Sequence, residues 1–109
     1  LFPDQWRHDN PNFLDHLPKS SEQTPINTLN KQTEAITNWT GTCNRLGNIT
    51  QPTMVLVGTD DVLTAPANSI LITEKIPAAW LIQIKGGGHA MMMQYPEKFS
   101  NIVDTFLTS

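Results

Sequence analysis

The stretch QPTMVLVGTDDVLTAPANSILITEKIPAAWLIQIKGGGHAMMM, residues Gln51 to Met93, contains two short apolar runs that each end at a glycine-marked turn. The runs are Thr53–Gly58 and Ala79–Ile84, and the segment between them has room for one helix. Two strands joined by a helical crossover of this length are typical of a β-α-β unit, in which the strands run parallel. The stretch therefore predicts an α/β fold.

An acidic residue follows the first run and a histidine follows the second. These residues are Asp61 and His89. Because the carboxyl ends of parallel strands meet at one edge of a sheet, we expect the two side chains to lie side by side there. A carboxylate beside an imidazole is two thirds of a nucleophile–base–acid triad. Asp60 is the alternative acid, but it could instead serve only to form the turn, because Asp is favoured in turns.

Two segments of this stretch resemble the α/β-hydrolases. The segment from Pro52 to Asp61 resembles the acid strand and turn of that family. The segment from Gly86 to His89, with the amphipathic helix that begins at Pro96, resembles its histidine loop and last helix. The order of acid and then histidine is also the order of the family. The family spacing of Gly, two residues and Asp selects Asp61 rather than Asp60.

The resemblance implies a division of the chain and a role for each site residue. Residues 49–109 would be the C-terminal part of an α/β-hydrolase core, with two parallel strands and helices. Residues 1–48 would be a cap-like or lid-like segment, partly irregular. His89 would be the general base of a Ser-His-Asp triad, and Asp61 would orient the ring and balance its charge.

The serine of this pattern is not found in the sequence. The family places it in a G-x-S-x-G turn between a strand and a helix. No serine of this chain has the flanking glycines; the serines are Ser20, Ser21, Ser69, Ser100 and Ser109. We therefore expect the C-terminal part of a larger serine hydrolase that acts on a carboxylic ester or related acyl substrate. We expect the isolated chain to be inactive, because a general base alone has no nucleophile to activate.

Two other interpretations remain open. In the first, the chain is a non-catalytic binding module with an α/β-hydrolase-like fold, or a truncated inactive relative. This interpretation is open because a fold does not determine a function. Alternatively, it is a small doubly wound α/β domain of unrelated function, in which Asp61 and His89 carry no shared role.

Charge, hydropathy and residue spacing argue against several kinds of partner. The chain has 109 residues and a formal net charge of −3, which argues against the basic surface of a nucleic-acid-binding protein. No apolar stretch approaches the roughly 18 residues of a membrane span. The sequence has no H-x-x-x-H or C-x-x-C spacing, so we predict no metal site. The resemblance implies no cofactor.

Further helices are predicted on both sides of the decisive stretch. Thr24 as N-cap and Pro25 at the first helical position favour a helix that ends at Gly41. Its apolar stripe consists of Ile26, Leu29, Ile36 and Trp39. A helix that starts near Pro66 should end at Pro77. The last helix has the clearest apolar stripe, which should pack on the sheet; it consists of Phe99, Ile102, Val103, Phe106 and Leu107.

The N-terminal segment and several single residues are predicted to have structural roles or no role. Residues 1–25 should be irregular apart from a short helical turn between Phe13 and Leu17. For Met91, Met92 and Met93 we predict packing in the core, and the alternative is that they line an acyl or hydrophobic pocket. Cys43 is predicted to be buried or half-buried. His8 and His16 are predicted to be loop histidines without a function. Because two parallel strands are too few for a stable sheet, we expect a homo-oligomer of the isolated chain.

Overall fold

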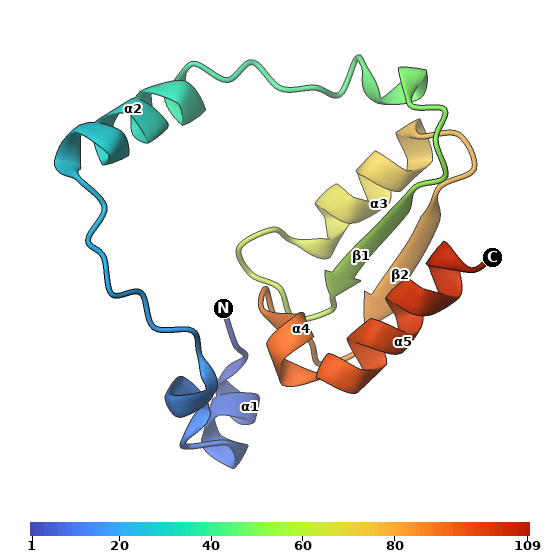
Figure 1. Cartoon of the computed structure of the whole chain (residues 1–109). Coiled ribbons are helices and arrows are strands. Elements are labelled where there is room, and N and C mark those ends of the chain that lie inside the picture. Colours follow the sequence, from blue (N-terminus) through green and yellow to red (C-terminus); the bar gives the residue numbers. More distant parts are fainter.

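The centre of the protein is a pair of parallel strands. In the computed structural model, which describes residues 1–109 apart from the side chain of His16, β1 (Met54–Gly58) pairs with β2 (Trp80–Ile84). The register places Met54 opposite Trp80 and Gly58 opposite Ile84. The predicted parallel pairing is therefore confirmed, and both strands end at the same edge of the sheet (Figure 1).

Two helices lie on opposite sides of this pair. Helix α3 (Pro66–Lys75) is the crossover, and Figure 1 shows it on the opposite side of the strands from α5 (Pro96–Leu107). Both helices begin with proline, which is favoured at the first helical position because its missing N–H would be unpaired there anyway. Phe106 of α5 meets the ring of Trp80 edge-on, with 5.3 Å between the ring centroids. The predicted packing of the last helix on the sheet is present at this contact.

The core lies mainly at the carboxyl ends of the strands. Val57 and Ile84, near the ends of β1 and β2, are each 2% exposed, and Ala90 and Met91 are buried beside them. Burying such aliphatic side chains contributes about 1.5–3 kcal/mol each. Ile76, directly after α3, is also buried. The core is therefore concentrated at the edge of the sheet where Asp61 and His89 emerge.

The N-terminal residues form more regular structure than the sequence predicts. Residues Asp4–Asp9 form helix α1, and Phe13–His16 form the short 3₁₀ helix η1. The prediction of an irregular segment is wrong for α1, because Trp6 on this helix stacks on Phe2 and also contacts Phe13. Aromatic pairs of this kind contribute about 0.5–1.5 kcal/mol beyond their burial. This aromatic cluster depends on packing between segments, which a local pattern does not contain.

The predicted amphipathic helix is present but shorter than expected. Helix α2 (Ile26–Thr37) begins after Pro25, which occupies the N-cap position without a side-chain hydrogen bond. Thr24 is therefore not the cap, because its neighbour Pro25 is extended and the Pro25 carbonyl already accepts from the N–H groups of Thr28 and Leu29. The helix ends before Asn38 rather than at Gly41, since the residues between them are poor helix formers.

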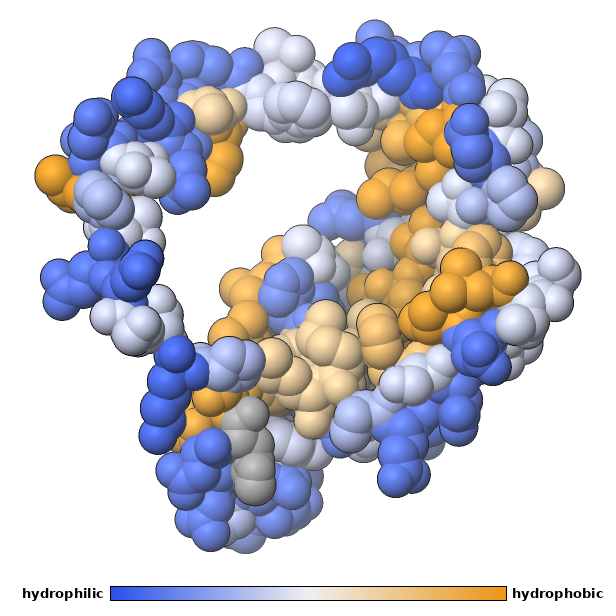
Figure 2. All heavy atoms as spheres, viewed as in Figure 1, coloured by the Kyte–Doolittle hydropathy of each residue, from blue (hydrophilic) through white to orange (hydrophobic). Residues whose placement is uncertain are grey.

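Helix α2 stands apart from the strands. Figure 2 shows open space between the α2 region and the rest of the molecule. Its apolar side chains are correspondingly exposed, by 71% for Ile26 and 76% for Ile36. The chain then returns through the short 3₁₀ helix η2 (Leu46–Asn48) to β1. Cys43, in this return segment, is exposed, so the prediction of a buried cysteine is wrong, because no other element covers the segment.

The described helices are all too short or too polar to cross a lipid bilayer.

Candidate active site

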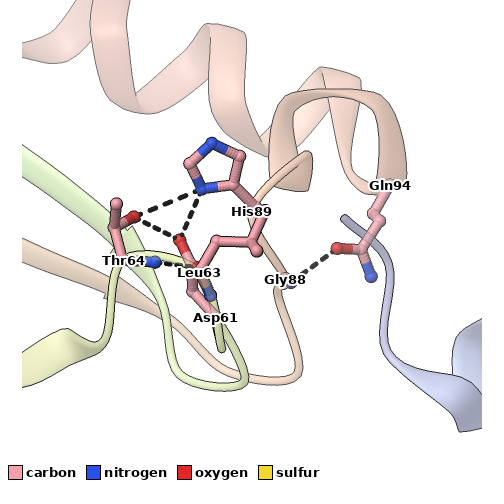
Figure 3. Close-up of polar contacts among 6 residues, drawn as sticks. All are labelled: Asp61, Leu63, Thr64, Gly88, His89 and Gln94. Atoms are coloured by element: carbon pink, nitrogen blue, oxygen red, sulfur yellow. Dashed lines mark hydrogen bonds and ion pairs between the residues drawn. The ribbon is translucent and has the colours of Figure 1, made fainter. Parts of the chain in front are cut away.

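The turn after β1 buries the carboxylate of Asp61. The side chain of Asp61 is 5% exposed. Its Oδ1 atom accepts hydrogen bonds from the backbone N–H groups of Leu63 and Thr64, each at 2.9 Å. Its Oδ2 atom accepts a hydrogen bond from the Thr64 hydroxyl at 2.8 Å (Figure 3). The acid thus organises its own turn, because it pairs the N–H groups that the turn leaves without strand partners.

These hydrogen bonds decide the charge of Asp61. Burial raises the pKa of the carboxyl group, because a buried charge loses its hydration. The Thr64 N–H, the His89 ring, the Thr64 hydroxyl and the Leu63 N–H lower the pKa and outweigh burial. The pKa of Asp61 consequently falls from 3.8 to about 2, and the residue is a carboxylate at neutral pH.

The loop after β2 carries His89 and is fixed at two points. Gly87 lies so close to Gly58 that a side chain on Gly58 would overlap the Gly87 carbonyl, which locks the two turns together. Gln94, in the short helix α4 (Met91–Gln94), is buried and accepts a hydrogen bond from the Gly88 N–H at 2.6 Å. The Gln94 amide also donates to the Gly86 carbonyl at 3.3 Å. The His89 loop is therefore held from both sides.

Asp61 and His89 meet at the edge of the sheet, as their positions after parallel strands predict. The Oδ2 atom of Asp61 lies 3.0 Å from the Nδ1 atom of His89. Figure 3 shows the second ring nitrogen, Nε2, turned away from the carboxylate. The His89 side chain is 41% exposed, so this nitrogen is accessible. The arrangement suits an imidazole that exchanges a proton at Nε2 while a carboxylate holds Nδ1.

Asp60, the alternative acid, has a different partner. Its Oδ1 atom accepts a hydrogen bond from the Thr59 hydroxyl at 2.8 Å, and its side chain is not bonded to His89. The hydroxyl of Thr59 also accepts from the Gly86 N–H at 2.9 Å. Asp60 thus belongs to the turn, and the structure brings together Asp61 and His89 rather than Asp60 and His89.

The other sequence candidates do not join the site. The prediction that His8 lies in a loop is wrong, because His8 is part of helix α1. It is exposed, and its Nδ1 atom lies 3.2 Å from Oδ1 of Asp9. The side chain of His16, predicted to have no function, lies outside the described residues. Within the described part of the chain, no group of three or more His, Cys, Asp or Glu side chains is arranged to bind a metal ion.

Sequence reasoning missed Thr64 and Gln94. Thr64 bonds to both Asp61 and His89, and Gln94 holds the histidine loop. The signal for Gln94 was a single polar residue after three methionines, which does not reveal that its amide is buried. The signal for Thr64 was its position three residues after the acid, where a threonine hydroxyl can return to a carboxylate on the same turn.

Two pockets lie on the N-terminal side of the site. The first, of about 360 Å³, contains His89 and Asp60 in its lining together with the segment from Leu1 to Asp4 and the exposed side chains of Val62 and Leu63. The second, of about 610 Å³, is next to it across Phe2, and its lining residues do not include Asp61 or His89. The smaller pocket is the candidate site, because His89 lies in its lining.

The methionines divide between core and pocket. Met91 is buried, in agreement with the predicted packing role. Met92 and Met93 are 41% and 44% exposed and line the larger pocket opposite Trp6 and Phe13. The packing prediction is therefore wrong for these two, because α4 turns them towards the N-terminal aromatic residues instead of the sheet.

Two solved structures superpose on part of this chain. MGS-MChE2, an α/β hydrolase from the metagenome of sediments of the lagoon of Mar Chica in Morocco, superposes with a TM-score of 0.65 and 28% sequence identity, over 76% of this chain and 37% of that chain. This chain carries part of the α/β-hydrolase fold. Est816, described as an enzyme that degrades N-acyl homoserine lactones, superposes with a TM-score of 0.57 and 34% identity, over 59% of this chain and 25% of that chain.

Two curated sequences match part of the chain, and one of them is a hydrolase. RutD of Yersinia enterocolitica, assigned as a carbamate hydrolase, is 37% identical over 62 residues, which are 57% of this chain and 22% of that protein. The polyketide synthase ThaQ of Burkholderia thailandensis is 36% identical over 63 residues, which are 58% of this chain and 3% of that protein. No family model matches the chain. The chain spans at most 37% of the length of any of these four proteins.

Proposed function

We propose that this chain is the C-terminal part of a serine hydrolase and supplies two members of its Ser-His-Asp triad. The observation that carries the proposal is the hydrogen bond between the buried carboxylate of Asp61 and Nδ1 of His89, which leaves Nε2 exposed. Residues 49–109 are the core portion in this proposal, and residues 1–48 form a cap or lid segment. The N-terminal residues Leu1 to Asp4, which line the pocket of His89, support that assignment.

The mechanism follows from the two ring nitrogens. A serine hydroxyl contributed by the rest of the hydrolase would give its proton to Nε2 of His89 while its oxygen attacks an acyl carbon. The ring would then be an imidazolium, whose charge the Asp61 carboxylate offsets, and Nε2 would return the proton to the leaving group. Asp61 would remain ionised throughout, in agreement with its lowered pKa.

The substrate class is a carboxylic ester or a related acyl compound. The lactone that Est816 degrades and the carbamate assigned to RutD both contain an acyl carbon bonded to a heteroatom. The pocket beside His89 is lined mainly by apolar residues, with the carboxylates of Asp4 and Asp60 also in its lining. Carboxylates repel anions, so this lining favours a neutral ester or amide over an anionic acyl compound.

The test uses the full-length protein that contains this chain. His89→Ala should abolish hydrolysis of a short-chain activated ester, while His8→Ala, an exposed histidine on α1, should leave the rate unchanged. A fluorophosphonate probe should label a serine outside these 109 residues and no serine within them. Labelling of a serine in this chain, or full turnover by His89→Ala, would contradict the proposal.

A second candidate function is supported by the sequence itself. No G-x-S-x-G turn occurs in these residues, as expected of a non-catalytic module or an inactive relative with the same fold. The coding sequence upstream of Leu1 distinguishes the two functions, since a G-x-S-x-G turn between a strand and a helix there supports the enzyme. If the full-length protein contains no such turn and is not labelled by the probe, the binding module is the better assignment.

A further inference from the structure

The hydroxyl of Thr64 lies between the acid and the histidine. Its Oγ1 atom donates to Oδ2 of Asp61 at 2.8 Å and lies 3.2 Å from Nδ1 of His89. The Asp61–His89 distance closes this triangle at 3.0 Å. Figure 3 shows all three side chains converging on the same point. Acceptor atoms repel one another at these distances unless a proton lies between them. The positions of the protons on Thr64 and His89 can therefore be derived.

The proton count fixes the tautomer of His89. An ionised carboxylate only accepts hydrogen bonds, and a threonine hydroxyl has one proton to give. That proton is used on Asp61, which leaves the lone pairs of Oγ1 towards His89. Nδ1 of His89 therefore faces two acceptors, and a lone pair on Nδ1 would be repelled by both. The favoured neutral ring carries its proton on Nδ1 and shares it between Asp61 and Thr64.

We propose that Thr64 is a positioning residue, which holds His89 in the Nδ1–H tautomer and fixes the rotation of its ring. The catalytic use of that tautomer rests on the function proposed above. The tautomer matters because it leaves the lone pair on the exposed Nε2, where a base must accept its proton. The backbone of the His89 loop is fixed by Gln94, but a fixed backbone leaves the rotation of the ring open.

No other described side chain provides this second contact. Among the hydrogen bonds of the described residues, the His89 ring is bonded to Asp61 and Thr64 alone. A single acceptor fixes only the direction of the Nδ1–H bond, whereas two acceptors also fix the plane of the His89 ring. Removal of the Thr64 hydroxyl should therefore loosen the ring and also leave Asp61 without one of its donors.

The tautomer can be measured directly in this chain by nuclear magnetic resonance. Long-range ¹⁵N–¹H correlations distinguish a protonated from an unprotonated ring nitrogen, at a pH where the imidazole is neutral. The wild-type chain should show mainly the Nδ1–H form. Thr64→Val, which keeps the shape but removes the hydroxyl, should lower the ratio of Nδ1–H to Nε2–H forms about three- to tenfold, as expected for one hydrogen bond.

Matched variants separate positioning from folding. Thr64→Ser keeps a hydroxyl and should retain the wild-type ratio. Thr73→Val removes a hydroxyl that bonds only to the Ser69 carbonyl within α3, and it should leave the ratio unchanged. A wild-type ratio in a folded Thr64→Val chain would overturn the proposal.

The wild-type chain offers a measurement that needs no variant. The Thr64 hydroxyl proton, held by Asp61, should exchange slowly and show a nuclear Overhauser contact to the imidazole Nδ1–H. A hydroxyl signal without that contact would overturn the proposal, even if Thr64→Val failed to fold. In the full-length protein, Thr64→Val should lower kcat with little change in KM, and Thr64→Ser should restore kcat.

The two proposals can fail separately. Full turnover by His89→Ala would refute the proposed function but would leave the tautomer measurement on this chain intact. A tautomer ratio insensitive to Thr64 would refute the positioning role while leaving the triad of Asp61 and His89 in place.

Discussion

The Oδ2 atom of Asp61 lies 3.0 Å from the Nδ1 atom of His89, although 28 positions separate the two residues in the sequence. The distance is short because β1 and β2 are parallel neighbours whose carboxyl ends coincide. The two turns are further locked together where Gly87 crosses Gly58. The contact is therefore a property of the β-α-β unit as a whole.

The free energy of unfolding should decrease at low pH because Asp61 becomes protonated. Its pKa is about 2 in the folded chain against 3.8 ordinarily, so the folded state binds the proton more weakly than the unfolded state. The resulting stabilisation is fully present above about pH 5 and is lost as the pH falls towards about 2. It amounts to about 1–2 kcal/mol, where the lower value allows for solvent screening near the surface. Urea unfolding at a fixed protein concentration measures it.

Asp61→Asn should remove this pH dependence as well as the stabilisation. The control is Asp60→Asn, because the Asp60 side chain is exposed and bonded to the adjacent Thr59. Asp60→Asn should keep the fall in stability between about pH 5 and about pH 2. If the two variants behave alike, the lowered pKa does not belong to Asp61.

The same pair of variants separates the acid from its neighbour in catalysis. Under the proposed function, Asp61→Asn in the full-length protein should lower kcat about 10⁴-fold, because an amide can hold the imidazole in the wrong tautomer. Asp60→Asn should cost far less, since Asp60 is not bonded to His89. Steady-state hydrolysis of an activated ester measures both. Wild-type turnover by Asp61→Asn would refute the role of Asp61.

The crossing of Gly58 and Gly87 should tolerate no side chain. A Cβ atom on residue 58 would overlap the Gly87 carbonyl and lie 2.8 Å from the Gly88 carbonyl oxygen, and backbone atoms cannot rotate away. Gly58→Ala should therefore cost about 3 kcal/mol or more and displace the His89 loop. Chemical denaturation measures the cost, and the tautomer spectrum of His89 reports the displacement.

Gly47→Ala is the matched control for this substitution. A Cβ atom there would meet only the Lys75 carbonyl oxygen at 3.7 Å, which is an ordinary contact. It should change stability by less than about 1 kcal/mol. Equal effects of the two substitutions would show that the two turns are not locked by close approach.

The isolated chain should self-associate. Two strands leave an unpaired edge on each side of the sheet, and unpaired edges are templates for further strands. Large apolar side chains are also uncovered, with Trp39 64% and Trp80 42% exposed. Sedimentation velocity at micromolar concentration should show a dimer or larger species. A monomer with cooperative melting would show that α1 and its aromatic contacts stabilise more of the chain than the strands suggest.

The sequence predicts the β-α-β unit and the acid–histidine pair because their signals are local. Apolar runs, glycine turns and Pro66 and Pro96 mark the ends of strands and helices without reference to the rest of the chain. The positions of Asp61 and His89 follow from the parallel topology alone. The parallel pairing and the contact between these residues are confirmed.

The features that the sequence does not predict depend on contacts across space. Helix α1 is stabilised by the contact of Trp6 with Phe2 and Phe13, which lie outside the helix. The hydrogen bonds of Gln94 follow from the fold of the histidine loop. The sequence pattern of α2 indicates an amphipathic helix but not whether its apolar side has a partner.

The buried carboxylate of Asp61 links folding to function unequally in the two members of the pair. Asp61 closes its own turn through the N–H groups of Leu63 and Thr64, whereas the half-exposed ring of His89 closes none. Loss of the acid would leave the turn without its acceptor, whereas loss of the histidine would remove one of the several hydrogen bonds to Asp61 and leave the turn closed. Under the proposed function, the presence of the histidine in a related chain would therefore indicate catalysis better than the presence of the acid, because the acid is also needed to close the turn.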